Sequence, residues 1–157
     1  MRAAAWLAAL VCLPLQAAGL THERAHELYM VAYGQYGSAH GGIPLPDKAP
    51  VIRLVRQNEL RQLYGCQSCE MQGVMTGEAV YLNDALDFST PFAASVVVHE
   101  FIHYFQHVRN GPAKDCQEAI QREYEAYGIQ LHLLERAGVD TFTIRLAVRA
   151  LRCPKEG

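Results

Sequence analysis

An apolar run interrupted by two histidines and a glutamate is the most constraining feature of this sequence. Residues 96–105 read Val-Val-Val-His-Glu-Phe-Ile-His-Tyr-Phe and contain the pattern H-E-x-x-H. On a helix of 3.6 residues per turn, His99 and His103 lie one turn apart on one face, so both imidazoles can reach one metal ion. Glu100 lies beside them, where it can take a proton from a metal-bound water. Two imidazoles suit Zn²⁺, and a third protein ligand would leave the fourth position to that water.

The same five-residue pattern occurs near the start of the chain, at His22, Glu23 and His26. Arg24 lies inside this early copy and would repel a metal cation, so we expect only the later copy to bind metal. The two later histidines could instead be hydrogen-bonded core residues. That interpretation leaves Glu100 unexplained, because a glutamate in an apolar helix is costly to bury.

Residues 1–19 have the composition of a secretory signal peptide. Arg2 precedes a short apolar stretch, which ends in the small residues 17–19. We expect cleavage to leave one domain, residues 20–157, in an exported protein, either periplasmic or secreted. The apolar stretch is too short to span a membrane stably, and no other apolar run is long enough.

Cysteines indicate an oxidising compartment. Of five cysteines, Cys12 falls in the expected signal peptide. The other four, Cys66, Cys69, Cys116 and Cys153, allow three disulfide pairings in an exported chain. We prefer Cys66 with Cys69 and Cys116 with Cys153, because the second bridge would tie the start of one helix to the end of the last. A redox role for Cys66 and Cys69 is disfavoured, since no strand-then-helix pattern frames them.

Charge gives little information about partners. The formal net charge is −2, and the sequence contains neither a basic patch nor an acidic tail. A nucleic-acid partner is therefore not expected. Oligomeric state is not indicated by any pattern in the chain.

Hydrophobic periodicity predicts an α+β fold that is mostly helical, with a small sheet or hairpin packed against the helix of the later motif. The 79–83 arm of the hairpin is a candidate edge strand. Residues 21–50 are a candidate segment for covering a cleft. The expected helices are residues 21–36, 57–64, 91–109 and 116–137, and a last helix that Asp140 or Thr141 caps and that includes Leu151. The expected strands are residues 51–55, 71–75 and 78–82.

The third metal ligand is expected on the helix that follows the motif. Gly111 and Pro112 make a short turn, which sends that helix back antiparallel, so that one of its carboxylates can face the imidazoles. Glu118, Glu123 and Glu125 compete for this place. Glu118 and Glu125 are seven residues apart and share a face, whereas Glu123 is expected to point elsewhere. Helix phase leaves Glu118 and Glu125 both open.

His99-Glu100-x-x-His103, followed by Glu125-Ala126 on the next helix, resembles the gluzincin branch of zinc metallopeptidases in a minimal, single-domain form. The resemblance implies a zincin-like domain that holds Zn²⁺ through His99, His103 and Glu125. It also implies Glu100 as the general base in the hydrolysis of a peptide or protein substrate.

The resemblance covers about residues 79–130 and includes a departure. Gln106 also occurs in small zincins, and the segment around Tyr81 is similar to the edge strand that pairs with their extended substrates. Larger gluzincins carry an aspartate where this chain has Ile129. The residue that supports a zinc-bound histidine is therefore unassigned, and Glu118 is a candidate.

Together these features predict a zinc-dependent peptidase. The alternative is a non-catalytic exported domain that binds a partner through a zincin-like cleft, which the retained Glu100 opposes. A peptidase also needs a donor for the developing oxyanion. The candidates for that donor are Tyr104, Tyr124, Tyr127 and His132.

Overall fold

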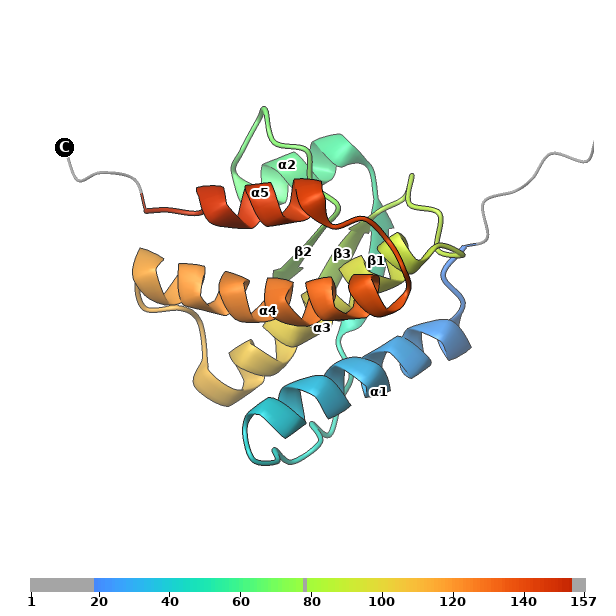
Figure 1. Cartoon of the computed structure of the whole chain (residues 1–157), viewed down its shortest axis with the longest axis vertical. Coiled ribbons are helices and arrows are strands. Elements are labelled where there is room, and N and C mark those ends of the chain that lie inside the picture. The colour runs from blue at the N-terminus through green and yellow to red at the C-terminus, as the bar shows by residue number, and fades with distance from the viewer. Residues whose placement is uncertain (1–18, 78, 154–157) are drawn as a thin grey trace, which may run out of the picture.

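The computed structural model describes residues 19–77 and 79–153, so the expected signal peptide, apart from Gly19, lies outside the described residues. No helix in the described ranges has both the length and the apolar character needed to cross a membrane. The chain has an α+β fold, as the sequence predicts (Figure 1). Its elements are α1 His22–Ala39, β1 Val51–Val55, α2 Gln57–Tyr64, β2 Gly73–Thr76, β3 Ala79–Asn83, α3 Pro91–Asn110, α4 Cys116–Arg136 and α5 Phe142–Ala150.

Helix α3 is the centre of the fold. Thr90 caps its first turn by accepting a hydrogen bond from the Ala93 backbone N–H, and Pro91 fits the first helical position. Gly111 ends the helix with a φ of 72°, which favours glycine. Helices α1 and α4 and the sheet all pack around α3, so apolar residues on several of its faces are buried (Figure 1).

The sheet has the strand order β1-β3-β2. Strand β1 pairs in parallel with β3, and β2 pairs antiparallel with β3 across the turn that contains Gly77. The expectation that residues 79–83 form an edge strand is therefore wrong. The reason is the pairing of β1 with the far side of β3, a non-local contact that alternation within the hairpin does not reveal. Strand β2 is an edge of the sheet and packs beside α3.

Helix α4 runs back antiparallel to α3, and α5 then runs back alongside α4 (Figure 1). Asp115 caps α4 by accepting a hydrogen bond from the Glu118 backbone N–H. Both preferred disulfides are present, Cys66–Cys69 and Cys116–Cys153. The second bridge fixes the chain after α5 to the first residue of α4.

Candidate metal centre

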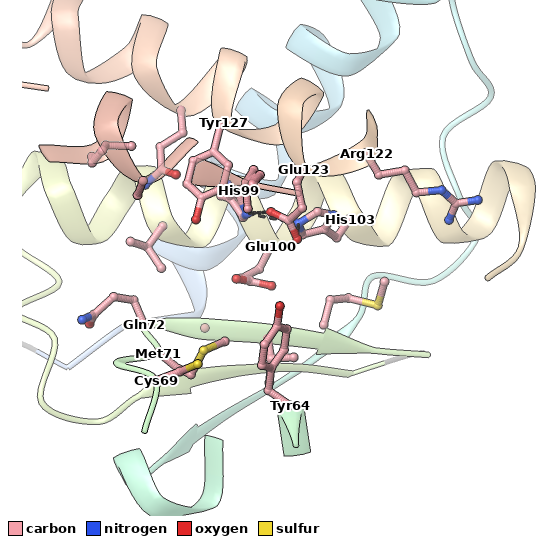
Figure 2. Close-up of a pocket in the computed structure, with 18 of the residues that line it drawn as sticks. Tyr64, Cys69, Met71, Gln72, His99, Glu100, His103, Arg122, Glu123 and Tyr127 are labelled. Atoms are coloured by element: carbon pink, nitrogen blue, oxygen red, sulfur yellow. Dashed lines mark hydrogen bonds and ion pairs between the residues drawn. The ribbon is translucent and has the colours of Figure 1, made fainter. Parts of the chain in front are cut away.

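Two histidines of α3 and one glutamate of α4 converge on a common point (Figure 2). The Nε2 atoms of His99 and His103 lie 3.0 Å apart. The carboxylate oxygens of Glu123 lie 3.4 Å from Nε2 of His99 and 3.3 Å from Nε2 of His103. Tetrahedral zinc with bonds of about 2.0–2.1 Å places its ligand atoms about 3.3 Å apart. The three side chains therefore fit one such ion.

Glu125, expected as the third ligand, lies elsewhere. One of its carboxylate oxygens is 2.5 Å from Nε2 of His40, at the end of α1, and the other accepts a hydrogen bond from Gln106. The structure brings Glu123 to the histidines instead, although helix phase led us to expect that residue on another face.

The rotation of α4 explains the difference. Its buried residues are Ala126, Gln130 and Leu134, and this face lies against α3. Glu123 precedes Ala126 by three residues and belongs to the same face, whereas position 125 is about 200° around the helix from position 123. The spacing of Glu123 to Ala126, Gln130 and Leu134 is the signal that could have placed Glu123 on the face toward α3 from sequence.

Glu118 also lies outside the triad. Its carboxylate accepts hydrogen bonds from the Lys114 backbone N–H and from the Arg122 guanidinium, and these bonds lower its pKa. Glu118 is thus engaged at the start of α4, and the structure provides no contact through which it would support a zinc-bound histidine.

The titratable groups of the triad stabilise one another's charged forms. Burial lowers the pKa of His103, but its hydrogen bond to Glu123 and the charges of Glu123 and Glu100 outweigh burial and raise it to about 9. Burial raises the pKa of Glu123, yet hydrogen bonds from His103 and His99 hold it well below the usual range. Glu123 is therefore ionised across the physiological pH range.

Glu100 lies beside the triad, between α3 and β2 (Figure 2). It is only 6% exposed, and burial raises its pKa, although the neighbouring histidines and a hydrogen bond from the Met75 backbone N–H partly oppose this. Gly73 makes the close approach of β2 possible, because a Cβ there would lie 2.7 Å from Cγ of Glu100. The sequence did not single out Gly73, because its contact with Glu100 joins two elements that are far apart in the chain.

The triad opens into a cleft of about 790 Å³ that α2, β2, α3, α4 and α5 enclose. All the residues that line the cleft lie between Leu63 and Leu151 in the sequence. Residues 21–50, the candidate cover for the cleft, therefore do not line it. Apolar side chains form much of its walls. They include Leu63, Met71, Phe92, Ile144, Ala147 and Leu151.

Two tyrosines face this centre. The Tyr127 ring lies 4.4 Å from the His99 ring, and burial together with the charges of Glu123 and Glu100 raises the pKa of Tyr127 to about 12. Tyr64 reaches toward Glu100 from α2 on the opposite side (Figure 2). Tyr64 was not among the residues singled out from sequence, because only the packing of α2 beside β2 brings it there.

The other expected oxyanion donors lie elsewhere. The Tyr104 hydroxyl donates to the Lys48 carbonyl, and the Tyr124 hydroxyl donates to the Leu151 carbonyl over 3.5 Å. His132 is exposed on α4. Of the four candidates, Tyr127 is the one that the fold brings to the triad.

Comparisons with known proteins found no match to this chain among protein-family models, curated proteins or solved structures. The function must therefore be inferred from the geometry and chemistry of these residues.

Proposed function

We propose that this protein is a zinc-dependent hydrolase of the zincin type, a peptidase that cleaves peptide bonds with a zinc-activated water. The observation that carries the proposal is the convergence of His99, His103 and Glu123, with Glu100 buried beside them. Two imidazoles and one carboxylate form a ligand set typical of catalytic zinc, with a fourth position open. A structural zinc site has all four positions filled by protein and needs no adjacent base.

Zinc bound by these three residues would lower the pKa of a water and polarise the scissile carbonyl. Glu100 would accept the proton of the attacking water and deliver it to the leaving nitrogen. Its raised pKa suits this role, because a base works best when its pKa approaches the working pH. The Met75 N–H holds the carboxylate in place through a hydrogen bond.

Tyr127 is the proposed donor to the developing oxyanion. Because its pKa is raised to about 12, its hydroxyl keeps its proton throughout the neutral range and can donate a hydrogen bond. Its ring is held against His99, and Tyr127 lines the cleft beside the triad. Tyr64 is more exposed and is available as a second donor.

The proposed substrate is an extended peptide or protein segment that lies along β2. All four residues of this strand line the cleft, and β2 is an edge of the sheet. An edge strand can pair with a further strand through backbone hydrogen bonds. Export of the protein, to the periplasm or outside the cell, is supported by the two disulfides and by the composition of residues 1–19.

Metal content and peptidase activity, measured together, test this function. Purified wild-type protein should contain about one zinc per chain and should cleave members of a peptide library, with activity lost to a chelator and restored by zinc. A protein that binds zinc and cleaves none of the peptides would favour the non-catalytic binding domain. A protein that binds neither zinc nor cobalt would refute the metal centre.

A further inference from the structure

We propose that Gln106 and Glu125 form a positioning relay, which orients His103 for the metal and anchors it to the end of α1 through His40. This inference rests on the proposed zinc site and assigns the support of a zinc-bound histidine, which the sequence left unassigned. Gln106 and Glu125 are positioning residues, since they contact a ligand or its neighbour and do not contact the metal.

The first contact in the relay joins two residues of α3. Oε1 of Gln106 lies 2.8 Å from Nδ1 of His103, and the Gln106 side chain is only 1% exposed. A histidine that donates from Nδ1 keeps the lone pair of its Nε2 available for a metal. The orientation of the Gln106 amide therefore decides whether Nε2 of His103 keeps its lone pair for zinc.

The partners of the Gln106 amide nitrogen fix that orientation. Nε2 of Gln106 donates to the Arg122 carbonyl over 3.0 Å and to the Glu125 carboxylate over 2.8 Å. Both partners are acceptors only. A flipped amide would place its oxygen against these two acceptors and leave its N–H groups facing His103, which is unfavourable in a buried site. The backbone of α4 and Glu125 thus select the donor state of His103 at Nδ1.

A neutral amide between the carboxylate and the histidine also suits the charge of this centre. Glu123 already supplies a negative charge at the metal position, and the Glu100 carboxyl lies beside it. A carboxylate in direct contact with His103 would add a further negative charge in a buried site, which is costly. With Gln106 between them, Glu125 can hold the amide while its own side chain stays partly exposed.

The relay ends at His40, the residue that follows α1. Its Nε2 lies 2.5 Å from the Glu125 carboxylate, and its ring packs against Tyr36 with 4.3 Å between centroids. Tyr36 is fully buried beside Phe105 of α3. Helix α1, which lies away from the cleft, is thereby joined to the metal centre through His40, Glu125 and Gln106.

The test compares zinc affinity in matched variants, measured by competition with a chelator. Gln106→Leu removes the acceptor for His103 and should weaken zinc binding by about 10- to 100-fold, the usual cost of losing such a partner. Gln130→Leu is the control, because Gln130 is also a buried glutamine, 4% exposed, but it bonds to Ser95 outside the relay. It should keep the wild-type affinity.

Position 125 gives a second comparison that does not disturb the core. Glu125→Leu should weaken zinc binding, and Glu125→Gln should restore most of the affinity, because an amide oxygen can still accept the Gln106 N–H. The absorption spectrum of the Co²⁺-loaded protein should shift in Gln106→Leu and Glu125→Leu and stay unchanged in Gln130→Leu. Melting temperatures of the metal-free variants separate these effects from loss of fold.

Failure of the relay and failure of the zinc site give different results. If wild-type protein binds zinc, and both Gln106→Leu and Glu125→Leu keep its affinity and cobalt spectrum, the relay is overturned and the zinc site stands. If Gln106→Leu does not fold, the comparison of Glu125→Leu with Glu125→Gln decides alone whether the relay exists. If wild-type protein binds neither metal, the zinc site is refuted, and the relay with it.

Discussion

The two copies of H-E-x-x-H in this chain share a local structure but differ in their surroundings. Both lie on helices, so in both the histidines are one turn apart on one face. In the early copy His22, Glu23 and His26 are all exposed, and Arg24 forms an ion pair with Glu27. In the later copy His99 is 7% and Glu100 is 6% exposed.

The difference shows what converts a sequence pattern into a candidate site. Helix α4 lies against the later copy and supplies Glu123, whereas no third ligand among the described residues converges on His22 and His26. Strand β2 also packs on the later copy, where Gly73 lies close against the side chain of Glu100. Burial and a ligand from a second element, both set by tertiary packing, distinguish the two copies.

Removing the proposed base should give the largest difference between the two copies. Glu100→Gln should lower the rate of peptide hydrolysis by about 10²- to 10⁴-fold, because the amide cannot accept the proton of the attacking water. Zinc content should remain at the wild-type value. Glu23→Gln makes the same change in the early copy and should leave the rate unchanged; an equal loss in both variants would contradict the assignment of the base.

Removing the proposed third ligand should have the next largest effect. Glu123→Gln should weaken zinc binding by more than the roughly 100-fold that loss of a supporting residue can cost, since a direct ligand is lost. Chelator competition measures this, with Glu125→Gln as the control. A smaller loss in Glu123→Gln than in Glu125→Gln would restore Glu125 as the ligand.

A side chain at position 73 should disturb the packing of β2 against Glu100. The added methyl group of Gly73→Ala would overlap the Glu100 side chain, and such overpacking costs about 1–3 kcal/mol of unfolding free energy. Urea denaturation measures the change, and hydrolysis should fall as well. Gly128→Ala on α4 meets no atom within 4 Å and should instead stabilise the helix by about 0.5–1 kcal/mol. Equal stability of wild type and Gly73→Ala would argue against this packing.

The smallest effect is expected from the early histidines. The double substitution His22→Ala and His26→Ala should leave zinc at one equivalent per chain and the affinity unchanged, because both side chains are exposed and no carboxylate of the described residues completes a metal site with them. Metal analysis after dialysis provides the measurement. Loss of a second zinc equivalent in this variant would show that burial is not the deciding factor.

The sequence alone determined the elements and the pair of histidines. Thr90 and Pro91 begin α3, Gly111 ends it and Asp115 begins α4, each through contacts with residues only a few positions away. The spacing of His99 and His103 fixes their shared face for the same reason. The hairpin at Gly77 and the preferred disulfide pairs were also predicted correctly.

Only the tertiary structure decided which carboxylate joins the histidines and which strand lies beside them. The rotation of α4 depends on how Ala126, Gln130 and Leu134 pack on α3, so phase counting from Glu118 and Glu125 chose the wrong face. The central place of β3 depends on β1, and the contact of Gly73 with Glu100 depends on the sheet that results. These are contacts between residues far apart in the chain, and their energies are shared among many side chains. The spacing of Glu123 with the buried residues of α4 marks one face of that helix, but it does not say against which element the face packs.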